Sequence, residues 1–208
     1  MLAAMSVLGS CGALCAQEVL DRIVVRIENE VILLSELRAL GRYQKFADGK
    51  PESDEQILDR LIDQWIVRSE ADTARFAHPS EAEIDRSLDR LERSFGSLEE
   101  YEARKRESGQ SDAEVRAMIA SQLYLSSYLD SRFRPVVQID PQEIAKFYQE
   151  TVVPRAKARG QEAPALEAAR DAIQEFLVQR GITAQAEQWI KESRDRLHVD
   201  RLLTEATK

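Results

Sequence analysis

The residues that could carry out acid–base or metal chemistry are few and widely separated. The chain contains two histidines, His78 and His198, and neither is surrounded by cysteines or acidic residues at the spacing of a metal-ligand set. His78 precedes Pro79, where we expect a helix to end, and His198 lies in a segment with strand-like alternation. The sequence therefore predicts no metal site and no catalytic histidine.

Motifs for covalent catalysis and for nucleotide binding are also missing. The chain has no G-x-S-x-G, no G-x-G-x-x-G and no G-x-x-x-x-G-K motif. Several serines, among them Ser35, Ser80, Ser97 and Ser111, stand where helix N-caps are expected. The acidic pair Glu99 and Glu100 falls in the first turn of a predicted helix, where carboxylates favour the helix dipole. We therefore expect no catalytic residue, no cofactor and no enzymatic activity.

The first sixteen residues, MLAAMSVLGSCGALCA, carry no charged side chain. They are shorter than the roughly 20 residues of a membrane-spanning helix, and they fit the apolar region of a secretory signal that is cleaved after Ala16. Alternatively, Leu8 to Cys11 (LGSC) resembles the lipobox of bacterial lipoproteins, in which Cys11 would be lipidated and tether the protein to a membrane. A native N-terminal helix is the third alternative. Both cysteines, Cys11 and Cys15, lie in this segment, so cleavage would leave an exported protein without cysteine.

The overall composition favours helices and an acidic surface. The 208-residue chain has a formal net charge of −8, from 29 Lys and Arg against 37 Asp and Glu. Because nucleic-acid binding needs clustered basic residues, this charge argues against a nucleic-acid partner. Only 8 glycines and 6 prolines are present, which suits helices better than a turn-rich β fold. We therefore predict a mainly α fold.

One hairpin and one isolated strand interrupt the helical pattern. Residues 23–27 alternate with period two, Asn29 is suited to a positive φ in the turn, and residues 31–34 return as a second strand. Ser35 is then expected to be the N-cap of the first helix. Residues 197–202 alternate again near the other end of the chain. Because an isolated hairpin is marginally stable in water, we predict that this last strand pairs with the first and completes a small antiparallel sheet.

Helical periodicity and N-cap signals mark the rest of the chain. We expect helices over about 35–46, 54–76, 80–95, 97–108, 111–133, 140–153, 165–179 and 183–196. Gly181 is predicted to separate the last two helices. Residues 154–164 are expected to form a charged linker that contains two prolines and one glycine.

The helix over 111–133 has more apolar surface than one buried stripe requires. One interpretation is a central core helix with neighbours on all sides. The other is an open cradle for unfolded segments, lined by Met118, Tyr124 and Tyr128 together with Tyr101 from the preceding helix. These four residues are the candidate client-binding side chains.

The order of these parts resembles a known family. The segments that carry the resemblance are DRIVVRIENEVILLSEL, ILDRLIDQWIVRSEA, PSEAEIDRSLDRL, MIASQLYLSSYL, IDPQEIAKFYQE and EFLVQRGITAQAEQWIKESRDRLHVDRLL. In this order they are similar to the SurA-type periplasmic chaperones. Residues 17–153 resemble the N-terminal helical module of that family, and residues 165–203 resemble its C-terminal helix and strand. Parvulin-type prolyl isomerase domains lie between these parts in the family, and here only the linker 154–164 occupies that place.

The resemblance implies a function without implying an enzyme. It predicts an ATP-independent holdase in the periplasm that holds unfolded exported or outer-membrane proteins, without a cofactor. The isomerase activity is not carried over, because the linker is far too short for a parvulin domain. An alternative is an envelope scaffold or adaptor with one folded partner, tethered through Cys11.

Overall fold

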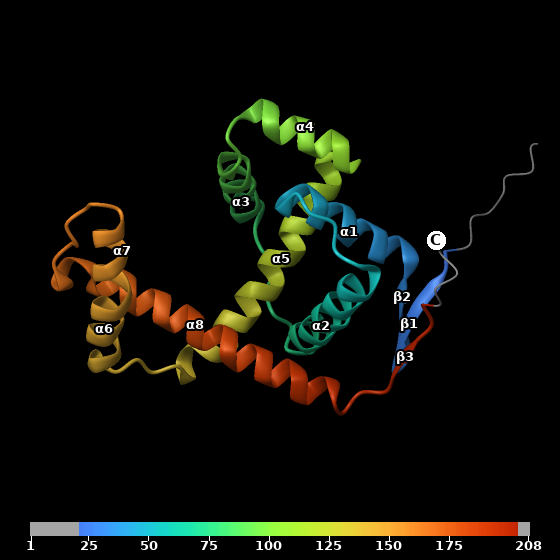
Figure 1. Ribbon diagram of the computed structural model, residues 1–208. Helices are drawn as coiled ribbons and strands as arrows, with labels where there is room; N and C mark the ends of the chain where they lie inside the picture. The colour runs from blue at the N-terminus through green and yellow to red at the C-terminus, as the bar shows by residue number, and fades with distance from the viewer. Residues whose placement is uncertain (1–20, 204–208) are drawn as a thin grey trace, which may run out of the picture.

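The computed structural model describes residues 21–203 (Figure 1). Our predictions for residues 1–16, including lipidation of Cys11 and cleavage after Ala16, concern residues outside this described part. The predicted mainly α fold with a small antiparallel sheet is confirmed. The sheet lies at one end of the molecule, and the helices extend away from it as a body and an arm.

The sheet joins the two ends of the described chain. Strands β1 (Ile23–Ile27) and β2 (Glu30–Leu33) form the hairpin, and β3 (Val199–Arg201) pairs with β1. Both pairings are antiparallel, and the order is β2-β1-β3, so β1 is central. Val199 stands opposite Ile27, and both belong to one apolar cluster. The predicted pairing of the last strand with the first is therefore confirmed.

Two details of the hairpin differ from the sequence-based prediction. Glu28, rather than Asn29, adopts the positive φ, at 50°. Two hydrogen bonds to the backbone of His198 hold it there: the Glu28 N–H donates to the His198 carbonyl at 3.1 Å, and the Glu28 carboxylate accepts from the His198 N–H at 2.8 Å. Helix α1 (Leu34–Asp48) begins one residue before the predicted N-cap Ser35. The reason is that the Glu36 carboxylate caps the Leu33 N–H, and the Ser35 N–H instead donates to Asp21.

Four further helices complete the body. They are α2 (Asp54–Thr73), α3 (Glu81–Ser94), α4 (Leu98–Ser108) and α5 (Asp112–Phe133). The predicted caps are present: the Ser80 N–H donates to Glu83, the Ser97 hydroxyl accepts from the Glu100 N–H, and Ser111 and Glu114 cap each other. Helix α5 crosses the centre of the body and contacts α1, α2, α3 and α8.

The rest of the chain forms an arm and then returns to the sheet. A short 3₁₀ turn, η1 (Arg134–Val136), leads to α6 (Pro141–Phe147), a π-helical turn (Tyr148–Val152) and α7 (Val153–Ala158). The predicted linker is therefore helical in its first five residues. Helix α8 (Leu166–Arg194) then runs from the arm back past α5 and α2.

The predicted helix break at Gly181 is wrong, because α8 passes through this residue without interruption. Glycine serves another purpose there. A Cβ atom at this position would lie 2.6 Å from the Val137 Cγ1 atom, which is closer than side-chain atoms approach. Gly181 thus lets the segment after η1 approach the surface of α8.

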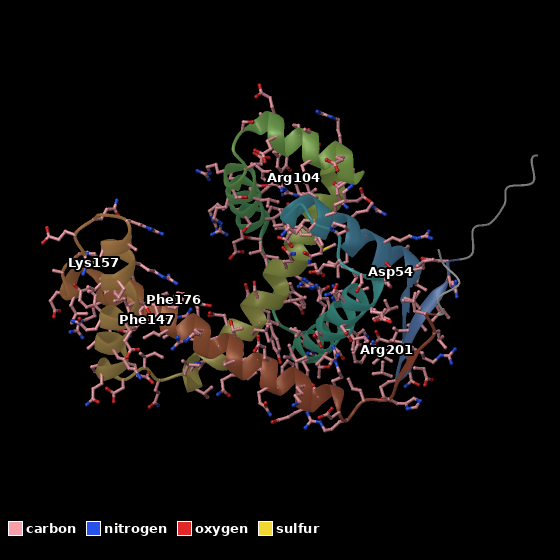
Figure 2. The ribbon with its side chains drawn as sticks, in the orientation of Figure 1. Asp54, Arg104, Phe147, Lys157, Phe176 and Arg201 are labelled. Atoms are coloured by element: carbon pink, nitrogen blue, oxygen red, sulfur yellow. The ribbon has the colours of Figure 1, made fainter. Side chains whose placement is uncertain are left out.

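The apolar core is divided into clusters that follow this architecture. The largest joins the sheet to α1 and α2 and takes in Trp189 from α8. A separate cluster of Ile144, Ile173 and Leu177 holds the arm together. Figure 2 shows Phe147 and Phe176 beside each other in the arm, with ring centroids 5.1 Å apart.

Ion pairs fasten the end of α8 and strand β3 to α2. The Arg194 guanidinium donates to the Asp59 carboxylate at 3.1 Å and also pairs with Asp63. The Arg201 guanidinium contacts the same Asp59 carboxylate at 2.6 Å. Burial raises the pKa of Asp63 despite the neighbouring Arg194.

Candidate functional site

The candidate site is a groove between α1, α2, α5 and strand β2, with a volume of about 360 Å³. We call it the central groove. Its lining residues are Glu30, Val31, Ile32, Glu36, Ala39, Leu40, Leu61, Gln64, Trp65, Arg68, Gln110, Glu114, Ala117, Met118 and Ser121.

Helical spacing explains how the two long walls form. On α2 the lining side chains Leu61, Trp65 and Arg68 follow one another at intervals of four and three residues. On α5 the residues Glu114 and Met118 are four apart in the same way. Side chains at these intervals share one helix face, so each helix presents a continuous stripe to the groove.

The floor of the groove is an extension of the core to the surface. Leu40 is buried, and Leu61, Trp65 and Met118 are partly buried side chains that pack against the main apolar cluster. Val31, at the β2 side, is 42% exposed. The groove therefore offers apolar surface that the fold itself leaves incompletely covered.

Polar groups form the rim. The Trp65 indole N–H donates to the Glu30 carboxylate at 2.9 Å, which fixes the ring against β2. One turn farther along α2, the Arg68 guanidinium donates to the Ser121 hydroxyl at 2.8 Å and so bridges α2 and α5. These two contacts hold the walls in place while leaving charged groups at the edge.

Glu114 is a carboxylate of the rim whose charge is already paired with a cation of the protein. It accepts from the Arg42 guanidinium at 2.8 Å and from the backbone N–H and hydroxyl of Ser111, each at 2.8 Å. The bonds from Ser111, together with Arg42, hold the pKa of Glu114 below its ordinary value, although burial acts in the opposite sense. Glu114 thus remains ionised and serves the helix cap.

Gln110 adds an unsatisfied donor to the groove wall. The residue is 8% exposed, and its Nε2 atom has no hydrogen-bond partner among the described residues. Buried amide donors are nearly always paired in folded proteins. Because this atom is itself buried, the unpaired donor lies within the wall of the groove and is not a contact point for a bound chain.

Of the four candidate client-binding residues, the groove includes Met118 alone. Tyr101, on α4, is buried among aromatic rings. Its ring centroid lies 5.4 Å from that of Phe46 and 5.3 Å from that of Phe95. Its pKa is raised by burial. The ring therefore belongs to the core in this structure and is not on a cradle surface.

Tyr124 and Tyr128 are buried as well, against the end of α2. The Tyr124 hydroxyl donates to the Asp72 carboxylate at 2.6 Å, and the His78 imidazole stacks on the Tyr124 ring at 4.3 Å. The Tyr128 ring meets Phe76 edge-on at 5.6 Å. The helix over 111–133 is therefore a core helix where it carries these two tyrosines. At Met118 it also lines a surface groove.

Sequence reasoning missed the residues that α1, α2 and β2 contribute to the groove. A signal was present on α2, where Leu61 and Trp65 widen the apolar stripe beyond the fully buried positions such as Ile62. No pattern within β2 marked Glu30 or Val31, because their proximity to α5 arises from the tertiary fold.

A second groove of about 570 Å³ lies between α5 and α8. Serines and a threonine, including Ser126, Ser127 and Thr183, line much of it. Leu129, Ile182, Ala186 and Ile190 also line it, but no aromatic side chain does, in contrast to Trp65 in the central groove.

The described residues contain no cluster of three or more His, Cys, Asp or Glu side chains placed to hold a metal ion. His198 lies 3.3 Å from Asp200, but its side chain is 78% exposed on the sheet. Within residues 21–203, no helix combines the length and apolar character needed to cross a membrane. The central groove is therefore the strongest candidate for a functional site, and its lining is suited to binding.

No protein-family model matches the chain. A comparison with curated proteins also returns no match.

Proposed function

We propose that the protein is an ATP-independent holdase that binds unfolded segments of exported proteins in the central groove. The observation that carries the proposal is the apolar floor formed by Leu61, Trp65 and Met118, which is continuous with the core and open at the surface. Incompletely covered apolar surface of this kind is typical of binding sites for other chains.

The size of the groove favours an extended client. A volume of about 360 Å³ lies at the lower end of the range for ligand sites, roughly 300–1,000 Å³, and accommodates a few side chains. An unfolded segment presents side chains individually along an extended backbone, so it can place one or two of them in the groove. A folded adaptor partner would instead need a larger complementary surface, since stable interfaces bury about 800 Å² per partner.

Two features of the sequence support an exported location and this function. The uncharged first sixteen residues fit a secretory signal. The order of the remaining segments resembles the helical module of the SurA-type periplasmic chaperones. We therefore place the proposed activity in the periplasm, with outer-membrane proteins as the expected clients.

Site-specific crosslinking tests the proposal. A photo-crosslinking amino acid is incorporated at position 117 in the groove, with position 168 on the exposed face of α8 as the matched control, and Cys11 and Cys15 are left unchanged. We expect the groove position to capture many different unfolded envelope proteins and the control position to capture few. Capture of a single folded protein would contradict the holdase and support the adaptor.

A groove-filling variant tests the same point in vitro. Ala117→Trp should occupy the groove and reduce suppression of aggregation for several unrelated unfolded proteins, while Ala168→Trp should not. Both positions are exposed, so neither variant should lower the melting temperature by more than a few degrees. Full suppression by Ala117→Trp would show that the groove is not the holding surface.

We also propose that the protein is not a prolyl isomerase. The segment between α6 and α8 comprises only the π-helical turn, α7 and a few further residues, which leaves no room for a parvulin domain. A prolyl-peptide assay should therefore proceed at the uncatalysed rate, over a barrier of roughly 18–20 kcal/mol. An acceleration that survives purification to homogeneity would overturn this prediction.

A further inference from the structure

The central groove runs along a free edge of the sheet. Three consecutive residues of β2, Glu30, Val31 and Ile32, line it. Successive side chains of a strand point to opposite faces of the sheet, so a groove on one face would contact only every second residue. Contact with three consecutive residues indicates that the groove meets the edge of the strand. The order β2-β1-β3 gives β2 a partner on one side only within the described residues. On the other side, the Leu33 N–H already donates to the Glu36 carboxylate, and the remaining edge N–H and C=O groups can pair with an added strand.

The charge of the groove is unequal between its two sides. Glu30 and Glu36, on the β2 and α1 side, form no ion pair within residues 21–203. The third carboxylate, Glu114, is paired with Arg42. Arg68 lies on α2, one turn beyond Trp65, and donates to Ser121 on α5. The β2 side therefore carries two carboxylates that a cationic side chain of a bound segment can approach.

We propose that the groove binds segments that combine a large apolar side chain with a nearby Lys or Arg, and that these segments add to β2 as a further strand. This inference rests on the proposed holdase function and names its preferred client class. The apolar side chain enters over Leu61 and Met118, and the cation lies beside Glu30 and Glu36. Because side chains two residues apart share one face of a strand, about 7 Å apart, the preferred pattern is apolar-x-basic or its reverse.

Charge also argues against a second copy of this chain as the occupant. Pairing of β2 with the β2 of another molecule would bring Glu30 and Glu36 of both copies to one interface. Like charges across such an interface are unfavourable, and the chain as a whole carries a net charge of −8. A basic, extended segment of another protein avoids this repulsion.

Fluorescence anisotropy with five labelled peptides and the full chain tests the client class. Three peptides share one central Phe and carry Lys, Gln or Glu two residues away on both sides. The other two are the Lys peptide with alternate backbone amides N-methylated, in one register or the other, which removes the strand-pairing donors of one edge. We expect the Lys peptide to bind about tenfold more tightly than the Glu peptide at low salt, with most of the difference lost at about 0.5 M salt. We expect N-methylation on the pairing edge to weaken binding by about tenfold or more.

Paired variants locate the charge effect. Glu30→Gln with Glu36→Gln keeps side-chain acceptors for the Trp65 indole and for the Leu33 N–H but removes both charges. We expect this double variant to bind the Lys and Gln peptides equally. The control, Glu150→Gln with Glu162→Gln, changes the net charge by the same amount on the exposed arm and should retain the preference.

The outcomes separate this inference from the proposed function. Equal affinity for the Lys, Gln and Glu peptides overturns the basic preference while leaving the holdase intact, provided that aggregation is still suppressed. Unchanged binding of N-methylated peptides of both registers overturns strand addition. Failure of every peptide to bind, together with no suppression of aggregation, removes both proposals. A concentration-dependent dimer that Val31→Lys abolishes would identify a second copy as the occupant and contradict the inference.

Discussion

Tyr124 shows how one side chain connects two elements. Its hydroxyl donates to the Asp72 carboxylate at 2.6 Å, and its ring is covered by the His78 imidazole. The hydrogen bond to this carboxylate, reinforced by burial, raises the pKa of Tyr124 to about 12. The protonated phenol is thus the form that the fold stabilises, and it links the middle of α5 to the end of α2.

Replacing this hydroxyl should cost stability in a defined pH range. We expect Tyr124→Phe to lower the free energy of unfolding by about 1–2 kcal/mol at neutral pH, because the Asp72 carboxylate loses a donor. The folded-state pKa lies above the ordinary value of 10.0, so the contribution is complete below about pH 10 and is lost as the pH rises toward 12. Urea denaturation at pH 7 and at pH 10 to 11 measures both effects. Equal midpoints for the variant and the wild type at pH 7 would contradict the prediction.

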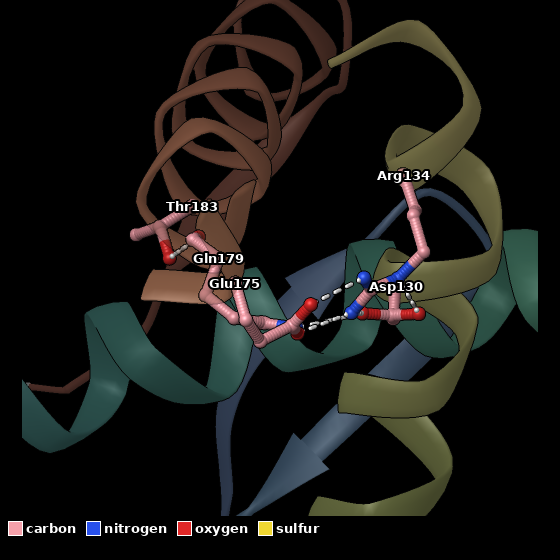
Figure 3. Close-up of polar contacts among 5 residues, drawn as sticks. All are labelled: Asp130, Arg134, Glu175, Gln179 and Thr183. Atoms are coloured by element: carbon pink, nitrogen blue, oxygen red, sulfur yellow. Dashed lines mark hydrogen bonds and ion pairs between the residues drawn. The ribbon is translucent and has the colours of Figure 1, made fainter. Parts of the chain in front are cut away.

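At the scale of elements, a polar network attaches the arm to the body. Figure 3 shows the Arg134 guanidinium of η1 between the Asp130 carboxylate of α5 and the Glu175 carboxylate of α8, at 2.8 Å from each. The Gln179 amide donates to both carboxylates. The bond from Arg134, with that from Gln179, lowers the pKa of Glu175 to about 2. The junction therefore depends on ionised carboxylates.

This network predicts an acid-sensitive junction. Glu175 titrates at 4.5 when unperturbed and at about 2 in the fold, so its stabilising effect is complete above about pH 4.5 and is lost as the pH falls toward 2. Glu175→Gln should therefore be less stable than the wild type at pH 7, and the gap should close between pH 4.5 and 2. Denaturant midpoints across this range provide the measurement, with Glu162→Gln as the control. A gap that stays constant with pH would show that the charge of Glu175 does not contribute.

Gly181 offers a second test at this scale. Alanine normally favours a helix over glycine by about 1 kcal/mol. At this position, however, the added Cβ would meet the Val137 Cγ1 atom at 2.6 Å. We expect Gly181→Ala to destabilise the protein by about 1–2 kcal/mol, because overpacking outweighs helix propensity.

A double-variant cycle decides the cause. Val137→Ala removes the methyl groups that clash, so Gly181→Ala with Val137→Ala should be more stable than Gly181→Ala alone in chemical denaturation. If Gly181→Ala alone raised the denaturation midpoint, the close approach would not be limiting and the helical propensity of alanine would dominate.

At the scale of the whole molecule, strand β3 ties the end of α8 to the N-terminal hairpin. It pairs with β1, and Val199 and Trp189 pack on the main apolar cluster. Arg201 reaches Asp59 on α2. Residues near both ends of the described chain thus pack together at the sheet and on α2.

Removing the closing strand should therefore affect the whole fold. We expect deletion of residues 197–208 to lower the melting temperature by about 5 °C or more, because backbone pairing and the burial of Val199 are lost together. Exposure of the second edge of β1 should also promote aggregation. Deletion of residues 204–208 alone is the control, and the comparison isolates the effect of residues 197–203. An unchanged melting temperature and a monomeric truncated protein would show that β3 contributes little to stability.

Local signals in the sequence determined most of the elements. The alternation of residues 23–27 and 197–202 predicted the strands, and the pairs Ser80–Glu83 and Ser111–Glu114 predicted helix starts. These features could be predicted because each depends on hydrogen bonds or periodicity within a few residues. The pairing of the first and last strands is a long-range contact, and it was predicted from the marginal stability of an isolated hairpin. The mainly α class followed from the same signals.

Only the tertiary structure decided the features that depend on distant neighbours. Gly181 looked like a helix break, and its contact with Val137 instead explains a glycine inside an unbroken helix. The sequence pattern was compatible with an exposed or a buried Tyr124, and the tertiary structure buries it with its hydroxyl bonded to Asp72. The central groove forms where β2, α1, α2 and α5 converge, and no single segment encodes it. Burial and proximity are properties of packed pairs far apart in the chain, so periodicity indicates which face is apolar but not what covers it.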